Sequence, residues 1–365
     1  MRILLAMGTR PEVIKMQSVY HALKESPLAE PIVCLTGQHM ELCDPLMKFF
    51  QIKVDHSLNL MSKNQTLSSL ASRVLGKLPL VLGDSTPDAV LVQGDTTTAL
   101  SVAIASFHEK IPVGHIEAGL RTGRLDSPFP EEGNRCMISR IAKWHFAPTE
   151  MAAKVLRSEN VSKDVHVTGN TVIDSLLKTK GKVSQDETDL LGLGLKPERY
   201  FLLTIHRRES FGAPLVRICE AINSLARSFP NYDFILPVHP NPNVRNVVTQ
   251  RLNGLENIKL LDPLPYPEFV LLMSNCHLII TDSGGIQEEA PALGKPVVVL
   301  RDVTERTEVL EVPSIKLAGT DPTKIINSVK ELLAIREPIR PNYIFGDGNA
   351  ARRIVEILTR GLNDH

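Results

Sequence analysis

One segment, HIEAGLRTGRLDSPFPEEGNR at residues 115–135, carries an unusual density of groups that can do chemistry. It follows the apolar run IPVG and holds four carboxylates and three arginines, with Glu117 next to the run and Glu131 and Glu132 after Phe-Pro. Carboxylates can exchange protons with a substrate, and arginines can bind anions or balance the carboxylates. The alternative for Glu131 and Glu132 is a favourable interaction with the dipole of a helix that starts there.

A second segment, TDSGGIQEEA, places Ser283, Gly284 and Gly285 at the expected start of a helix. Glycines let a ligand approach the backbone, and the free N–H groups and dipole of a helix N-terminus favour an anion. Glu289, one turn further, can accept hydrogen bonds from ribose hydroxyl groups. The segment is therefore a candidate cradle for nucleotide phosphates, and the alternative is that Ser283 simply caps the helix.

Other charged residues follow further apolar runs in the same way. They are Arg10 and Lys15 in MGTRPEVIK, Asp95 in QGDTTT, His206 and Arg207 in TIHRRES, His239 in LPVHPNPNV, and Arg306 in LRDVTERTE. Cations after several strands strengthen the prediction of an anionic ligand. Taken alone, an aspartate before three threonines can be a helix cap, and a histidine after a strand is more often structural.

The elements that must position these residues are short apolar runs, which alternate with stretches of helical period 3.6. About six runs precede residue 170 and about five follow residue 198. Continuous apolar runs are typical of parallel strands covered on both faces, and the alternation predicts doubly wound α/β domains. Ligands of such sheets bind at the carboxyl ends of the strands. The polar stretch 177–198 is expected to be surface or linker material between two domains.

Length and composition bound the class of protein. A chain of 365 residues favours two domains, and 41 basic against 41 acidic residues give no reason to expect nucleic acid or a membrane surface as a partner. The five cysteines form no C-x-x-C, so neither disulfides nor a metal site are predicted. Without a signal peptide or a long apolar span, we expect a cytoplasmic protein. Neither a nicotinamide-binding Gly-x-Gly-x-x-Gly nor a P-loop is found, so no cofactor is expected.

Together, GTRPEVIKM, QGDTTT, HIEAGLRTG, PFPEEGNR, VTGNTVIDSLL, HRRES, TDSGGIQEEAPALGKPV and LRDVTER resemble the non-hydrolysing UDP-N-acetylglucosamine 2-epimerases, in order, from residue 1 to about 357. The resemblance implies two Rossmann-like domains with a central cleft, the glycosyltransferase-B fold. It implies an N-terminal domain of residues 1–170 with a returning helix at 347–365, and a UDP-binding domain of residues 171–346. It also implies a homodimer and a UDP-sugar substrate.

The resemblance further implies a reaction and a set of roles. Family members invert C2 of UDP-N-acetylglucosamine by expelling UDP and adding it back to a 2-acetamidoglucal, for polysaccharide biosynthesis. Asp95, Glu117 and Glu131 match the catalytic carboxylates, and His206 matches the group that donates to the leaving diphosphate. The substrate-binding positions are Arg10, Lys15, Phe269, Ser283, Gly284, Gly285, Glu289 and Arg306.

Candidate regulatory positions come from the same resemblance. In members that are activated by UDP-N-acetylglucosamine, matching positions are Gln38, Glu41, Arg207 and His239. Met40 stands where the family usually has arginine, so the loss of a cation puts activation in doubt. Leu264 stands where a glutamine is common, so one polar contact near the uridine is expected to be absent.

Four other functions remain open at the level of the sequence. Two are enzymes that change C2, namely a hydrolytic epimerase that releases ManNAc and UDP, and an epimerase of a modified UDP-2-acetamido sugar. The third is a glycosyltransferase of the same fold, and the fourth is a sugar-nucleotide sensor without turnover.

Overall fold

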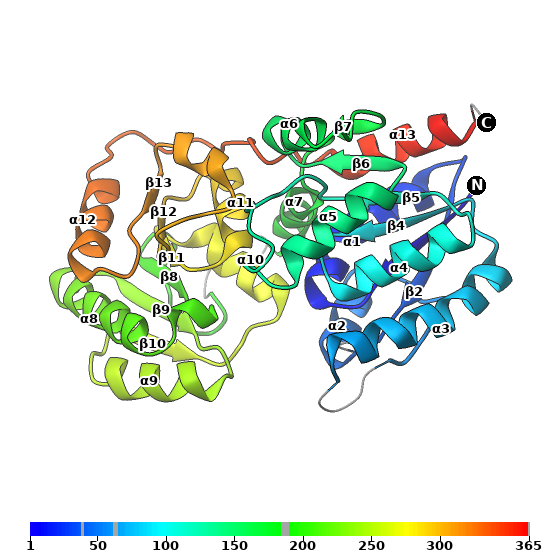
Figure 1. Ribbon diagram of the computed structural model, residues 1–365. Helices are drawn as coiled ribbons and strands as arrows, with labels where there is room; N and C mark the ends of the chain where they lie inside the picture. Colours follow the sequence, from blue (N-terminus) through cyan, green and yellow to red (C-terminus); the bar gives the residue numbers. More distant parts are fainter. Residues whose placement is uncertain (38–39, 61–64, 184–189, 364–365) are drawn as a thin grey trace. The chain divides into compact units, whose positions relative to one another are not determined.

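The computed structural model describes residues 1–37, 40–60, 65–183 and 190–363, and the chain folds into two compact units. Unit 1 comprises Met1–Ser175 with Ile344–His365, and unit 2 comprises Leu176–Tyr343. Each unit is a parallel sheet with helices on both faces (Figure 1). The prediction of two doubly wound α/β domains is confirmed by these two sheets.

The elements of unit 1, in chain order, are β1 (Arg2–Met7), α1 (Arg10–Glu25), β2 (Glu30–Leu35), α2 (Met40–Phe49), β3 (His56–Ser57), α3 (Leu67–Ser85), β4 (Ala89–Gln93), α4 (Thr97–His108), β5 (Val113–Ile116), α5 (Glu131–Ile141), β6 (Trp144–Ala147), α6 (Glu150–Ser158), β7 (Val165–Val167) and α13 (Ala350–Asn363). The boundary between the units falls inside α7 (Thr171–Val183). The strands pair in the order β3-β2-β1-β4-β5-β6-β7. Every residue of β4 is buried, as expected for a central strand covered on both faces.

The elements of unit 2 are β8 (Tyr200–Thr204), the 3₁₀ turn η1 (Arg208–Ser210), α8 (Ala213–Ser228), β9 (Asp233–Pro237), α9 (Pro242–Leu252), β10 (Ile258–Leu261), α10 (Tyr266–Asn275), β11 (Leu278–Thr281), α11 (Gly284–Ala292), β12 (Val297–Val299), the 3₁₀ turn η2 (Thr307–Glu311), β13 (Ile315–Leu317) and α12 (Pro322–Leu333). The strand order is β10-β9-β8-β11-β12-β13. Buried aliphatic and aromatic residues from β8, α8 and β9, such as Phe201, Ile222 and Phe234, form its core.

In each sheet the order in which the chain adds strands reverses once, although all strands are parallel. The reversal indicates where a ligand is expected to bind. The chain winds outward from β1 through β2 to β3 and then returns to β4 on the other side of β1. In unit 2 the same reversal lies between β8 and β11. At such a switch point the two following loops separate and leave a crevice at the carboxyl ends of the strands.

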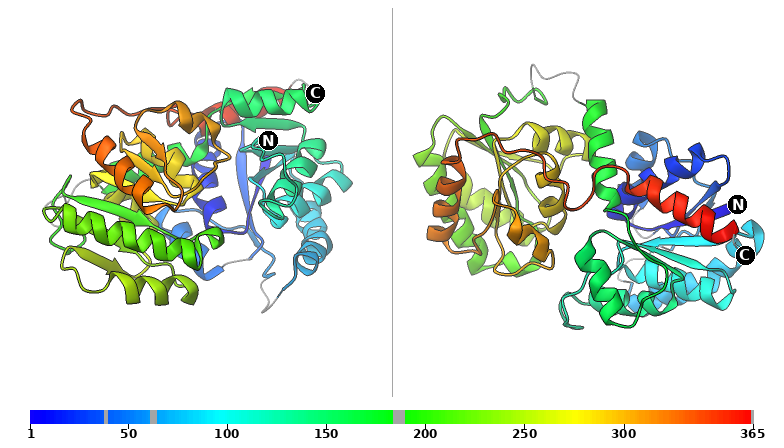
Figure 2. Two further views of the ribbon diagram at one scale, coloured as in Figure 1. Left: turned by 60° about the vertical axis from the view of Figure 1, so that its left-hand side comes forward. Right: turned by 90° about the horizontal axis from the view of Figure 1, so that it is seen from above.

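The return of the chain to unit 1 is fixed by contacts at the start of α13, which lies beside α1 (Figure 2). The Asp174 carboxylate accepts hydrogen bonds from the backbone N–H groups of Ala350 and Ala351, at 3.2 and 2.8 Å. Asn170 N donates to Phe345 O at 2.6 Å. Residues 345–363 therefore complete the first unit rather than the second.

The structure corrects two predictions about the elements. The stretch 177–198 is not a linker throughout, because α7 continues to Val183 with Leu176 and Thr179 on its buried side. The lysines in that stretch had suggested surface loop, but they lie on the exposed face of an amphipathic helix. The strands β3 and β13 were not predicted, since edge strands of two and three residues leave too short a pattern.

Among the helices of the described residues, none has the length and apolar character needed to cross a bilayer.

Candidate active site

In unit 1 the predicted residues lie at the carboxyl ends of the three central strands. Arg10 opens α1 directly after β1, and Lys15 lies further along the same helix. Asp95 lies between β4 and α4, Glu117 follows β5, and Glu131 is the first residue of α5. The fold thus brings to one edge of one sheet five residues that are spread over 122 positions of the sequence.

Glu117 is held in a strained and well-determined position. Its backbone has φ +66°, a left-handed conformation that costs a non-glycine residue about 1 kcal/mol. Its carboxylate forms an ion pair with Lys15 Nζ at 2.5 Å and accepts a hydrogen bond from Gln93 Nε2. The side chain is 6% exposed, so the lysine charge compensates for the loss of water around the carboxylate.

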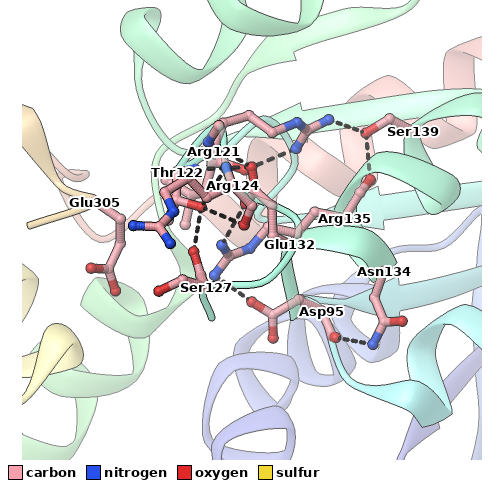
Figure 3. A network of polar contacts seen from close by, with 12 residues as sticks. Asp95, Arg121, Thr122, Arg124, Ser127, Glu132, Asn134, Arg135, Ser139 and Glu305 are labelled. Carbon is pink, nitrogen blue, oxygen red and sulfur yellow. Dashed lines mark hydrogen bonds and ion pairs between the residues drawn. The ribbon is translucent and has the colours of Figure 1, made fainter. Parts of the chain in front are cut away.

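Asp95 is held by two residues of α5, and it does not cap α4. The cap is Thr96, whose hydroxyl accepts a hydrogen bond from Ala99 N. The Asp95 carboxylate pairs with Arg135 at 2.6 Å, and its carbonyl accepts from Asn134 Nδ2 at 2.7 Å (Figure 3). The alternative interpretation of Asp95 as a helix cap is therefore wrong.

A neutral histidine, His115 on β5, stabilises the turn at Gly94 that precedes Asp95. His115 Nε2 lies 2.7 Å from Gly94 O. Burial lowers the pKa of His115 to about 3, so the ring is uncharged at neutral pH. A carbonyl only accepts, so Nε2 carries the proton and donates it.

Glu131 and Glu132 are adjacent in sequence and differ in their surroundings. Glu132 is 1% exposed, and its Oε1 accepts hydrogen bonds from Thr122 N and Gly123 N at 3.0 and 2.9 Å (Figure 3). Its Oε2 lies 3.2 Å from Arg135 Nη1. Glu131 Oε2 is buried and has no hydrogen-bond partner among the described residues. Glu132 therefore anchors the loop before α5, and Glu131 retains an oxygen for another group.

In unit 2, His206 follows β8 and is oriented by Asp282, which follows β11. His206 Nδ1 lies 2.9 Å from Asp282 Oδ1, and the same carboxylate accepts from the backbone N–H groups of His206 and Arg207 and from Ser210 Oγ. Asp282 is fully buried, and burial raises its pKa, but the hydrogen bond and charge of His206 outweigh burial and the net shift is downward. A carboxylate on Nδ1 fixes the ring so that Nε2 is the nitrogen available to a ligand.

A cluster of arginines and glutamates lies beside Gly284. A Cβ atom added to Gly284 would lie 2.7 Å from Arg306 Nη1 and 3.1 Å from Arg207 Nη2, so an alanine here would displace these guanidinium groups. Arg306 pairs with Glu288 and, at 2.6 Å, with Glu305. Burial opposes ionisation of Glu305, but Arg306 and Arg301 outweigh burial and lower its pKa to about 2. Glu288 and Glu305 thus hold the Arg306 guanidinium in place, and Glu305 stays charged at neutral pH.

The other predicted nucleotide-binding residues lie around the same helix start. Ser283 is the N-cap residue of α11, and its side chain makes no capping hydrogen bond, so the alternative that it serves merely as the cap is not supported. Gly284 and Gly285 form the first turn, whose N–H groups have no acceptor within a helix. Glu289 is buried one turn further, and Phe269 is half-buried on α10.

The candidate regulatory residues are only partly described. Gln38 lies outside the described residues, and the side chain of Glu41 is not described. Arg207 is beside Gly284, as above, and the ring of His239 stacks on that of His206 with centroids 6.3 Å apart. His239 Nδ1 accepts from Asn241 N at 3.2 Å, which leaves Nε2 as the protonated nitrogen of the neutral ring.

Several residues of these sites were not predicted from the sequence. They are Glu12, Gln93, Asn134, Asp282, Glu288 and Glu305, whereas Arg135 is one of the three arginines that the sequence predicts will bind anions or balance the carboxylates. The T-x-x-E pattern of TRPE is a known helix-start signal and points to Glu12. Gln93, Asn134 and Asp282 contact partners at least 24 positions away, so no local pattern reveals them.

Two doubly wound units, one with acidic groups at its strand ends and the other with a glycine-containing helix start and an oriented histidine, are the arrangement expected of a nucleotide-sugar enzyme. A family model described as UDP-N-acetylglucosamine 2-epimerase matches residues 21–359. The UDP-N-acetylglucosamine 2-epimerase of Escherichia coli O157:H7 is 45% identical over 98% of both chains. This protein belongs to the UDP-N-acetylglucosamine 2-epimerase family.

Solved structures agree with this assignment. The enzyme of Neisseria meningitidis, solved with UDP-GlcNAc bound, has a TM-score of 0.93 and 43% identity, and the match covers 99% of this chain and 100% of that chain. The enzyme of Methanocaldococcus jannaschii, in complex with UDP-GlcNAc and UDP, has a TM-score of 0.87 and 33% identity, with 99% and 100% covered.

Proposed function

We propose that this protein catalyses the reversible epimerisation of UDP-N-acetylglucosamine at C2 to give UDP-N-acetylmannosamine. The observation that carries the proposal is the full-length similarity to a family member solved with UDP-GlcNAc bound. The chemistry of the two units agrees with it, because unit 1 supplies proton-transfer groups and unit 2 supplies groups suited to a diphosphate.

The proposed route is elimination followed by addition. The C1–O bond to UDP breaks while the C2 proton passes to a base, which gives UDP and a 2-acetamidoglucal with trigonal C1 and C2. UDP then adds back to C1, and a proton is delivered to the opposite face of C2. The proton and the UDP that leave are both replaced, so the route needs neither an oxidant nor a cofactor.

Asp95, Glu117 and Glu131 are the proposed proton-transfer groups. A proton must be removed from one face of C2 and delivered to the opposite face, so at least two such groups are required. Lys15 beside Glu117 and Arg135 beside Asp95 stabilise the charged carboxylates, whereas Glu131 has an oxygen without a hydrogen-bond partner in the described structure.

The remaining proposed roles concern the leaving group. In its doubly protonated form, His206 donates a proton or hydrogen bond from Nε2 to the diphosphate as C–O cleavage proceeds, and Asp282 accepts from Nδ1 and keeps the ring oriented for this. Arg10 and Lys15 balance the developing charge. The proposed nucleotide contacts are Ser283, Gly284, Gly285 and Arg306 for the phosphates, Glu289 for the ribose and Phe269 for the uracil region.

Proton NMR of UDP-GlcNAc with the protein in D₂O tests the proposal. Epimerisation by this route places deuterium at C2 in both nucleotide sugars. Early accumulation of free ManNAc would indicate a hydrolytic epimerase instead, and exchange with a modified UDP-sugar alone would indicate the other substrate. A product that keeps its C2 hydrogen would contradict elimination.

Two substitutions and a matched control test the carboxylates. Asp95→Asn and Glu117→Gln should each lower kcat by at least about 100-fold, the usual scale for an acid–base group. The control is Asp126→Asn in the same loop, because Asp126 is 74% exposed and pairs only with Arg124 among the described residues. Near-wild-type kcat in both substituted enzymes would refute the assignment.

Further expectations stand as proposals. We propose that the functional domains have the bounds 1–170 with 347–365 and 171–346. We also propose that the protein is a cytoplasmic homodimer. Light scattering tests the dimer. We propose Gln38, Glu41, Arg207 and His239 as the regulatory positions. Activation is tested by comparing the rate of the back reaction from UDP-ManNAc with and without a small amount of added UDP-GlcNAc.

A further inference from the structure

Glu12, a residue outside the proposed catalytic and binding groups, lies at the switch point of the unit 1 sheet. It is 2% exposed and belongs to the first turn of α1. Its Oε2 accepts hydrogen bonds from Gly8 N, Thr9 N and Thr9 Oγ1, at 2.7, 2.7 and 2.9 Å. Its Oε1 accepts from Thr96 Oγ1 at 2.7 Å.

The two oxygens therefore serve two different turns. Oε2 closes the turn between β1 and α1, which is formed by Gly8 and Thr9 and leads into Arg10 (the Arg10 turn). Oε1 reaches the turn between β4 and α4, which carries Asp95. Thr96 also caps α4 through Ala99 N, so a single hydroxyl joins Glu12 to the start of that helix. These turns flank the reversal of the sheet, where loops otherwise diverge.

We propose that Glu12 is a positioning residue for the epimerase reaction, which fixes the Asp95 turn relative to the Arg10 turn through Thr96. This inference rests on the proposed function for its effect on rate. The hydrogen bond joins the first turn of α1, through Glu12, to the N-cap of α4, through Thr96, so its loss lets the two turns move apart. A misplacement of about 1 Å can cost about 100-fold in rate, so a loosened link should lower kcat rather than substrate affinity.

The test compares Thr96→Val with Thr66→Val. Thr66 caps α3 through Ser69 N at 3.1 Å, so both substitutions remove one helix cap from unit 1, and only the first breaks the bond to Glu12. Thr96→Val should lower kcat at least about tenfold with KM within about threefold. Thr96→Ser, which keeps the hydroxyl, should restore kcat, and Thr66→Val should stay within about twofold of wild type.

A double-mutant cycle separates the link from the lost cap. If Thr96→Val acts through Glu12, it should lower kcat no further in a Glu12→Ala background. If it acts through the cap of α4, the same factor should appear in both backgrounds, and this would overturn the proposal. Where Glu12→Ala does not fold, hydrogen exchange at residues 8–9 in Thr96→Val decides instead, because the cap of α4 does not include those residues.

Amide hydrogen exchange gives a readout that does not depend on activity. Thr96→Val should speed exchange at residues 8–9 as well as at 94–97, by about fivefold or more, whereas Thr66→Val should leave both turns unchanged. Unchanged exchange at residues 8–9 would overturn the link. Absence of C2 exchange by the wild-type protein would instead refute the proposed function and leave this structural result standing.

Discussion

The adjacent residues Glu131 and Glu132 allow a sharp prediction. The same isosteric change, glutamate to glutamine, should lower mainly the activity at Glu131 and mainly the stability at Glu132. Glu132→Gln removes the negative charge from a carboxylate that is 1% exposed. The amide keeps one oxygen for Thr122 N and Gly123 N, but its NH₂ group then faces Arg135, a donor. Glu131→Gln changes a carboxylate whose Oε2 has no hydrogen-bond partner within the described ranges.

The magnitude at Glu132 follows from these contacts. A hydrogen bond to a charged group is worth about 1.5–3 kcal/mol, and loss of one partner of a buried ion pair costs about 3–5 kcal/mol. Arg135 keeps Asp95 as a partner, so about 2–3 kcal/mol is expected. For a unit of this size that lowers Tm by about 4–12 °C. At Glu131 only the interaction with the α5 dipole is lost, about 0.3–1 kcal/mol, so Tm should fall by no more than about 4 °C.

Activity should show the reverse order. Glu131→Gln should lower kcat by at least about 100-fold, while Glu132→Gln, assayed well below its Tm, should lose much less. Differential scanning fluorimetry and solvent deuterium exchange at C2 measure the two quantities on the same samples. A Glu131→Gln protein with wild-type kcat, or a Glu132→Gln protein with wild-type Tm, would refute the division between a catalytic and an anchoring glutamate.

Three further predictions concern unit 2 and the start of α13. Asp282→Asn should lower kcat by about 100-fold or more with folding retained, because the orientation of His206 is lost; a wild-type pH–rate profile would contradict this. Gly284→Ala should weaken UDP binding, measured by calorimetry, because the new Cβ would displace Arg306, and an unchanged Kd would argue against phosphate binding there. Burial raises the pKa of Asp174 to about 6, so its contribution to stability is present at low pH and is lost as pH rises through 6. Relative to Asp174→Asn, the wild-type free energy of unfolding should therefore fall by up to about 3 kcal/mol between pH 4 and pH 7 in urea titrations, and parallel curves would exclude this.

The doubly wound fold was predictable because its central strands are short, nearly continuous apolar runs that alternate with helical patterns. The run of five buried residues in β4 has no polar alternation, and only a strand covered on both faces accommodates it. The edge strands β3 and β13 were not predictable, since two or three residues carry no period. The end of α7 was missed because its lysines and glycine resemble a loop when the buried partners of the helix are unknown.

For the site, the sequence indicates which residue types follow the strands, and it does not indicate their partners. Asp282 and His206 are 76 positions apart, and Glu12 and Thr96 are 84 apart. Their contacts depend on which strands are neighbours, and strand order is a property of the folded sheet. The roles of the predicted catalytic and binding residues themselves stay predictions, and the experiments above test them.

The position of α13 has a consequence for how the protein is made. Residues 350–363 are synthesised after the whole of Leu176–Tyr343, yet they pack on α1 and receive the Asp174 cap in unit 1. On the ribosome, the second unit thus has all its residues available while the first still lacks a helix. Unit 1 therefore cannot complete its fold until α13 has been synthesised. A fragment of residues 1–175 expressed alone should expose the apolar surface that this helix covers.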